Sequence, residues 1–229
     1  MKWISDLIDL IFPRHCLVCG ETLTRQEQHL CLNCLCQLPK LTPQQRQDIE
    51  KIFWGKVPIE RATSFIHYRK GSPFNALLHS LKYRNRPQVG EYLAHMAADE
   101  FIAEEFFNGI DLIIPLPLSK KKERRRGYNQ SYHIALGLSQ RTGIPVLTGA
   151  VTRTIANESQ THKNRDERWR NVEGIFAIKS PLALEGKHIL LVDDILTTGA
   201  TLCSCAATIT RQCNCKVSIL TLATTHNGI

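Results

Sequence analysis

The sequence contains no apolar run long enough to cross a bilayer. No stretch approaches the roughly 20 apolar residues that a membrane-spanning helix needs, so we expect no membrane span. Asp6 and Asp9 interrupt the apolar N-terminus and no small-residue cleavage site follows, so a secretory signal peptide is not expected either. Apolar residues at helical spacing from Trp3 to Ile11 predict a short amphipathic helix that ends before Pro13. We expect it to pack on the next element, with membrane-surface contact as the alternative.

Evidence for a disulfide framework is also missing. The nine cysteines are odd in number and no secretory signal precedes them, so we expect a reduced, cytoplasmic protein. There is no internal repeat and no low-complexity segment, and 43% hydrophobic with 22% charged residues is typical of a folded globular chain. The net charge of +8 favours anionic partners such as phosphorylated metabolites, nucleic acid or acidic proteins, without choosing among them.

From Arg61 onward, strand-like and helix-like runs alternate. The expected strands are 62–68, 111–118, 172–178, 188–194 and 216–223, and the expected helices are 74–83, 91–107, 129–143 and 199–212. This alternation predicts an α/β fold with a mostly parallel sheet flanked by helices. Residues 1–58 are expected to form a small N-terminal module with a connector, and residues 59–229 the main domain.

The strand at 188–194, HILLVDD, runs directly into ILTTGAT, where a helix is expected to begin. Backbone N–H groups at a helix N-terminus lack partners and, with the helix dipole, suit a phosphate. Gly199 lets the backbone come close to such a group. Hydroxyl donors are added by Thr197, Thr198 and Thr201. No Lys follows the glycine, so this is not a Walker A loop; the alternative is an ordinary strand–turn–helix with a threonine cap.

Two carboxylates, Asp193 and Asp194, end the same strand. Carboxylates there can accept hydrogen bonds from ribose hydroxyls, and two adjacent anions suit bound Mg²⁺. A phosphorylated sugar is therefore the expected ligand.

Near the N-terminus, two CxxC pairs stand eleven residues apart. The four cysteines are Cys16, Cys19, Cys31 and Cys34. Two such pairs complete a tetrahedral Zn²⁺ site, and nothing marks an open coordination position, so the site is expected to be structural. His15, His29 and Cys36 are possible substitute ligands, although the spacing favours the four cysteines. The C-terminal cysteines are expected to be small buried apolar residues, with a second metal site or redox sensing as alternatives; they are Cys203, Cys205, Cys213 and Cys215.

The string LLVDDILTTGATL at 190–202 resembles the signature of type I phosphoribosyltransferases. In that family the acidic pair holds the ribose hydroxyls of phosphoribosyl pyrophosphate, and the TTGAT loop holds its 5-phosphate. The resemblance implies that Asp193 and Asp194 contact the ribose, with Mg²⁺ bound alongside the donor. It assigns the 5-phosphate to Thr197, Thr198, Gly199, Ala200 and Thr201.

Two further segments suit transfer from such a donor, in which the protein positions the sugar and neutralises the leaving pyrophosphate. Pro115 and Leu116 belong to a turn whose backbone N–H groups are expected near the pyrophosphate, and the basic loop that follows begins at Lys120 and ends at Arg126. A solvated loop or a nucleic-acid contact is the alternative for this run. The charged segment 153–171 lies where type I phosphoribosyltransferases carry a mobile loop, so the resemblance implies a lid that excludes water. A disordered surface loop is the alternative. The expected catalytic residues are Asp193, Asp194, Arg126 and Arg165.

More widely, the chain resembles the ComF family. The resemblance rests on IIPLPLSKKKERRRGYNQ at 113–130, on LKY at 81–83, on the paired CxxC, and on a spaced pattern of single residues. That pattern is Arg153, Gln160, Arg165, Asn171, Gly174 and Phe176. Tyr128 stands where the family has Phe, and the glycine-containing turn usual near 213–215 is absent. The resemblance implies a zinc-ribbon-like module joined to a phosphoribosyltransferase-like domain, and for some members a role in DNA uptake with a helicase partner.

Two functions remain open from the sequence. The first is a Mg²⁺-dependent phosphoribosyltransferase whose acceptor is unknown. The second is a non-catalytic module that senses phosphoribosyl pyrophosphate while its surface holds a helicase or single-stranded DNA. No aromatic series typical of single-strand binders is present, and neither is a base-recognition signature for adenine, guanine, orotate or uracil. Met1 is followed by Lys2, so the N-terminal cysteine of glutamine amidotransferases is also missing.

Overall fold

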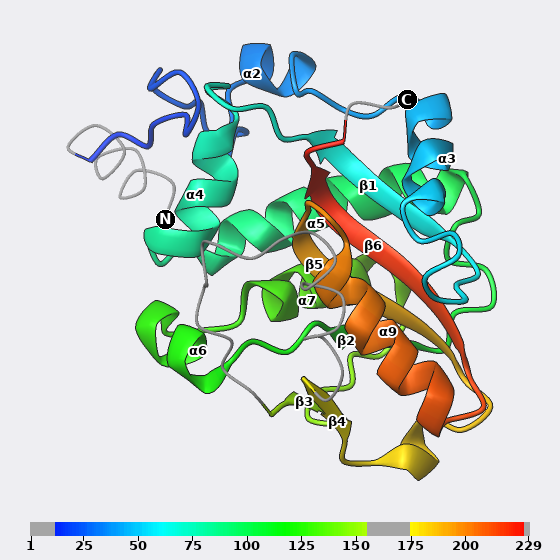
Figure 1. Cartoon of the computed structure of the whole chain (residues 1–229). Helices are drawn as coiled ribbons and strands as arrows, with labels where there is room; N and C mark the ends of the chain where they lie inside the picture. The colour runs from blue at the N-terminus through cyan, green and yellow to red at the C-terminus, as the bar shows by residue number, and fades with distance from the viewer. Residues whose placement is uncertain (1–11, 155–174, 227–229) are drawn as a thin grey trace.

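A parallel four-stranded sheet forms the centre of the molecule. The computed structural model describes residues 12–154 and 175–226, and within them the strand order is β1-β6-β5-β2 (Figure 1). These strands are β1 (Ala62–His67), β2 (Leu112–Pro115), β5 (His188–Leu196) and β6 (Lys216–Thr224). All three neighbouring pairs are parallel, as the alternation of strand and helix predicts. A short antiparallel pair, β3 (Val151–Arg153) with β4 (Phe176–Ile178), lies apart from this sheet.

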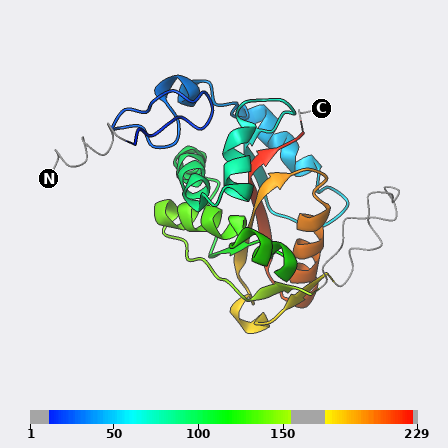
Figure 2. The same cartoon turned by 90° about the vertical axis from the view of Figure 1, so that its left-hand side faces the viewer.

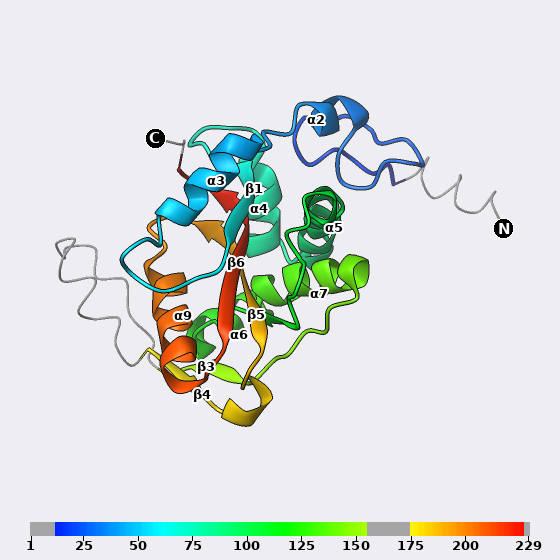
Figure 3. The ribbon, with the colours of Figure 1, turned by 90° about the vertical axis from the view of Figure 1, so that its right-hand side faces the viewer.

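Helices cover both faces of the sheet. One face carries α4 (Asn75–Tyr83), α5 (Pro87–Ala103) and α7 (Gln130–Thr142), and the other carries α3 (Pro43–Lys51) and α9 (Ala200–Gln212), as Figure 3 shows. Leu190 and Val192 of β5 belong to the first core, whereas Ile189 and Leu191 belong to the second. Because successive side chains of a strand point to opposite faces, one apolar run supplies both cores.

The cysteine-rich module lies at one edge of the molecule, beside α4 and α5 (Figure 2). Cys16, Leu23 and Leu30 share a hydrophobic cluster with these helices, and the module's helix is α2 (Leu32–Cys36). Next, α3 begins at a capping box in which the Thr42 side chain accepts the N–H of Gln45. Since α3 packs on β1, the connector is part of the second core; the boundary after residue 58 stays a prediction.

Most of the expected strands and helices are present, with ends shifted by a few residues. One expectation is wrong: the basic run is not a loop but a short helix, α6 (Lys120–Arg126). Ser119 caps its N-terminus and Gly127, at a φ of 82°, ends it. A last short element is the 3-10 helix η1 (Pro181–Ala183). The helix expected before Pro13 falls largely on residues 1–11, outside those described, and no described helix is long and apolar enough to span a membrane.

Candidate functional site

Two adjacent carboxylates lie at the carboxyl end of β5, where ligands bind in open parallel sheets. Asp193 is partly buried and Asp194 is buried. Asp193 Oδ1 accepts the hydroxyl of Ser131 at 3.0 Å and the backbone N–H of Asp194 at 2.8 Å. Ser131 lies in the first turn of α7, so the start of that helix holds the orientation of Asp193.

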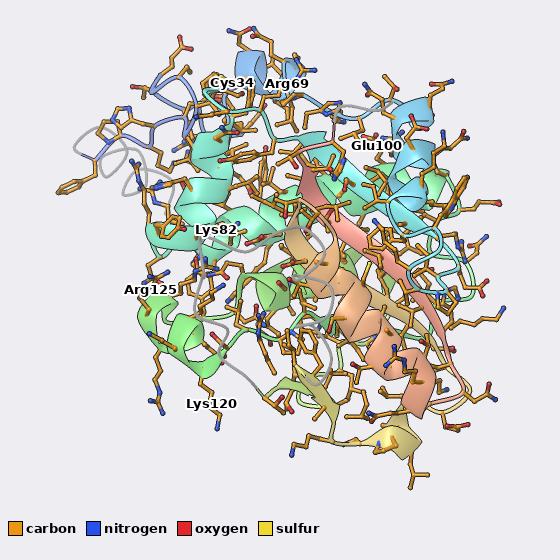
Figure 4. All side chains as sticks on the ribbon, viewed as in Figure 1. Cys34, Arg69, Lys82, Glu100, Lys120 and Arg125 are labelled. Carbon is orange, nitrogen blue, oxygen red and sulfur yellow. The ribbon has the colours of Figure 1, made fainter. Side chains whose placement is uncertain are left out.

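Lys82 balances the second carboxylate. Its Nζ lies 3.0 Å from Asp194 Oδ1, and the two side chains are only 19% and 11% exposed. Lys82 lies in the last turn of α4, on the same side of the molecule as the basic helix α6 (Figure 4). The sequence pattern pointed to LKY only as a family resemblance, because nothing local to residues 81–83 marks a contact with a strand so far along the chain.

Burial and the neighbouring Asp194 raise the pKa of Asp193 to about 7, against the lowering effects of Ser131 and Lys82. The pair therefore carries a variable negative charge near neutral pH. A carboxyl group with a strongly shifted pKa at the carboxyl end of a strand is typical of functional sites.

The segment that follows forms a tight turn into α9. Gly199 has a φ of 74°, and a Cβ there would meet Ile52 at 3.2 Å and Phe53 at 3.4 Å, both from the turn after α3. Only glycine combines this backbone with this packing. No side chain caps α9 at Gly199, and the N–H of Ala200 makes only a long hydrogen bond to Thr198 Oγ1, at 3.4 Å. An anion at this helix start could therefore accept hydrogen bonds from the first turn of α9. Thr197 and Thr198 are exposed, whereas Ala200 and Thr201 are partly buried in the first turn.

The turn after β2 contributes less than expected. The N–H of Leu116 donates to the Val192 carbonyl at 2.8 Å, and Pro115 and Pro117 have no N–H. The expectation that these three residues offer backbone donors to a pyrophosphate is therefore wrong. Asn129 instead fixes the turn, since its side-chain amide donates to the Leu116 carbonyl at 3.1 Å and its Oδ1 caps α7.

The cations of α6 differ in position. Lys120 is exposed at the start of the helix (Figure 4). The pKa of Lys122 is lowered by partial desolvation of its ammonium and by neighbouring arginines, and the negative charge of Asp193 opposes this shift. Arg126 donates to Gln130 Oε1 at 2.6 Å and lies over the Tyr83 ring at 5.6 Å. Arg126 of α6 thus contacts the end of α4 at Tyr83, the residue next to Lys82.

Arg153 is a further cation, which the sequence marked only as part of the ComF pattern. Burial lowers its pKa and Asp193 opposes the shift, while its guanidinium lies 5.6 Å from the centre of the Phe176 ring. It ends β3 and begins the segment 153–171 that is expected to be a lid. From residue 155 onward this segment, with Arg165, lies outside the described residues.

The four cysteines of the two CxxC pairs converge. The ligand atoms of Cys16, Cys19, Cys31 and Cys34 all lie within 4.8 Å of one another, and the sulfurs of Cys19 and Cys31 are 3.6 Å apart. Two thiolates about 2.3 Å from one tetrahedral ion would be about 3.8 Å apart, so the set fits a metal such as zinc. His15, His29 and Cys36 are not in this cluster, which agrees with the preferred ligand set.

Electrostatics within the cluster also favour a cation. Burial opposes ionisation of Cys16, but the backbone N–H groups of Cys19, Cys31 and Val18 lower its pKa to about 6. Burial and the neighbouring cysteines raise the pKa of Cys34. Four thiolates this close repel one another unless a metal ion neutralises them.

The C-terminal cysteines behave as expected. Cys203, Cys205 and Cys213 are at most 3% exposed and belong to the second core, and Cys215 packs against it. Burial raises the pKa of each of the four thiols, which keeps them protonated and unreactive.

The raised pKa of Asp193 predicts a pH-dependent stability. Between pH 4 and 7 the folded protein keeps a proton that the unfolded chain has released, so the free energy of unfolding falls as pH rises through this window, by up to about 4 kcal/mol. Urea unfolding of the ligand-free protein from pH 4.5 to 8 should show a shallower decline for Asp193→Asn, whose amide does not titrate. Asp99→Asn, which removes a surface carboxylate, should keep the wild-type slope. Parallel curves for wild type and Asp193→Asn would contradict the assignment.

Comparison with known proteins agrees with this geometry. Residues 124–228 match the phosphoribosyl transferase domain family. A DNA utilization protein YhgH of Salmonella typhimurium is 29% identical over 213 residues, covering 92% of this chain and 90% of the relative. Competence protein ComFC of Bacillus subtilis is 40% identical over 91 residues, covering 40% and 35% of the two chains. Competence protein F of Haemophilus influenzae is 30% identical over 195 residues, covering 83% of this chain and 76% of the relative. With a phosphoribosyltransferase-like domain and a four-cysteine cluster that fits a zinc ribbon, the chain belongs to the ComF (competence protein F) family.

Proposed function

We propose that this protein binds phosphoribosyl pyrophosphate with Mg²⁺ at the carboxyl end of β5 and transfers the phosphoribosyl group to an acceptor in DNA uptake or processing. The observation that carries the proposal is the shielded pair Asp193–Asp194, which runs directly into the turn at Gly199 and the uncapped start of α9. The printed names of the relatives, which refer to competence and DNA utilization, support the DNA context.

In this proposal each group has a physical task. Asp193 and Asp194 accept the ribose hydroxyls and hold Mg²⁺, which when bound neutralises charge on the departing pyrophosphate. The N–H groups in the first turn of α9 and the hydroxyls of Thr197, Thr198 and Thr201 hold the 5-phosphate. Arg126 and Lys120 of α6 stabilise the leaving group. Arg165 remains the expected contribution of a lid that keeps water from the activated sugar.

Loss of one carboxylate should weaken donor binding. Calorimetry with phosphoribosyl pyrophosphate and Mg²⁺ should show binding to the wild type, weakened about 10- to 100-fold in Asp194→Ala because charge-assisted hydrogen bonds are lost. Asp99→Asn, on the exposed surface of α5, should bind as the wild type does. A panel of bases, nucleotides and DNA should then identify an acceptor by the pyrophosphate released. Absence of binding to the wild type, or unchanged binding to Asp194→Ala, would refute the proposal.

We infer that the cysteine cluster holds one structural zinc ion. Zinc analysis after washing with a weak chelator should give one ion per chain, and Cys34→Ser should lose it because a buried ligand is removed. Cys36→Ser is the matched control, since Cys36 lies in the same helix but is exposed and outside the cluster. Replacing zinc with Co²⁺ should produce thiolate charge-transfer absorption in the wild type and in Cys36→Ser. Full zinc content in Cys34→Ser would show that the four-cysteine assignment is incorrect.

A second candidate function, non-catalytic sensing combined with single-stranded DNA binding, is favoured by one surface. Tyr83 is 59% exposed with Arg126 over its ring, and the other cations of α6, the helix that carries Arg126, are exposed. Aromatic rings stack on bases, and cations follow the phosphate backbone. This function would give donor binding without pyrophosphate release on any acceptor.

Salt dependence tests this surface. Arg124→Gln/Arg125→Gln should reduce the slope of log K against log salt for an oligothymidine by about 1.4, at about 0.7 per phosphate contact. Tyr83→Ala should weaken binding about 10-fold with little change in slope, since stacking is not electrostatic. Fluorescence anisotropy measures both effects. Lys187→Gln/Lys216→Gln, at the amino end of β5 and β6, should behave as the wild type does. Equal slopes for the two double variants would exclude α6 as a nucleic-acid contact.

A further inference from the structure

Lys82 occupies an unusual place for a lysine. It pairs with Asp194, the carboxylate that the proposed function gives to the donor, and it comes from α4 rather than from the basic helix. With side chains 19% and 11% exposed, this pair is far better shielded from water than a surface ion pair. A ligand cannot use Asp194 fully while the ammonium stays on it, so ligand binding and the position of Lys82 are coupled.

The surroundings of Lys82 indicate where its ammonium can go. The next residue, Tyr83, lies under Arg126, and the Leu81 carbonyl accepts the hydroxyl of Tyr128. The end of α4 is therefore in contact with the end of α6 and the turn after it. The proposed function assigns cations of α6 to the pyrophosphate. The flexible four-carbon side chain of Lys82 allows its ammonium to move while α4 stays in place.

We propose that Lys82 is a specificity-determining residue: it is a counterion that the donor displaces from Asp194 and that then pairs with the donor's pyrophosphate. This inference rests on the proposed function. A shielded ammonium left without an anion is costly, so displacement is favourable only for ligands that supply a replacement partner. Phosphoribosyl pyrophosphate supplies this partner through its pyrophosphate group. Ribose 5-phosphate has the same ring hydroxyls and 5-phosphate but no pyrophosphate, so the pocket rejects it.

The test compares two ligands on four proteins. Calorimetry with Mg²⁺ measures phosphoribosyl pyrophosphate and ribose 5-phosphate on the wild type, Lys82→Met, Lys82→Arg and Lys216→Met. Lys82→Met should bind phosphoribosyl pyrophosphate about 10- to 100-fold more weakly, while its affinity for ribose 5-phosphate stays equal or rises. Lys82→Arg should keep most of the wild-type preference, since it restores the charge. Lys216→Met removes an ion-paired lysine at the amino end of β6 and should leave both affinities unchanged.

A measurement in the absence of phosphoribosyl pyrophosphate distinguishes a role of Lys82 as counterion from a purely structural role. Electron paramagnetic resonance should show Mn²⁺ alone binding more tightly to Lys82→Met than to the wild type, because the carboxylates have lost their internal cation. Unfolding curves establish that the variants fold. Equal losses for both sugar ligands, or equal Mn²⁺ affinities, overturn the role of Lys82 and leave the proposed function standing. No binding of phosphoribosyl pyrophosphate to the wild type refutes the proposed function, and this inference with it.

Discussion

Placing two adjacent carboxylates at the shielded end of a central strand is the constraint on which the rest of this structure depends. Asp194 falls on the β5 face that also carries Leu190 and Val192, toward α4, and it meets Lys82 there. Asp193 is held instead by Ser131 at the start of α7. Desolvated carboxylates without such partners would cost several kcal/mol, so α4 and α7 must both be in place before this edge of the sheet is stable. The contacts that orient the candidate site are therefore also contacts that stabilise the fold.

The parallel sheet and the turn from β5 into α9 were predictable because the sequence signals for them are local. Residues 188–201 contain all of these signals in one stretch. They are an apolar run that serves both cores, two acids at its end and a glycine in the turn that follows. The two CxxC pairs were equally readable, since their spacing alone determines how four sulfurs meet. Lys82 and Ser131 were not, because their roles come from tertiary contacts; Ser131 stands 62 positions from Asp193. No residue pattern near either one records the partner.

The basic segment was misread for a different physical reason. Helix prediction from periodicity needs an apolar stripe, and no residue of α6 is buried. The helix forms because lysine and arginine have good helix propensity, Ser119 caps the start and Gly127 provides the left-handed end. Its consequence is that a helix fixes the directions of its cations: the charge of Asp193 acts on the pKa of Lys122, whereas Arg126 lies against Tyr83. A flexible loop would not divide these tasks.

As a result, the residues proposed for the two candidate functions are neighbours. Lys82 faces the carboxylates, and the next residue, Tyr83, presents an exposed ring beside Arg126. A polyanion held on this ring and on α6 would therefore lie next to the bound donor rather than on a remote face. Each phosphate of such a strand would also compete for the cations that the pyrophosphate needs, so the two ligands would be thermodynamically linked. The sign of that linkage is informative: an acceptor strand must bind together with the donor, whereas competition for the same cations would make each ligand weaken the binding of the other.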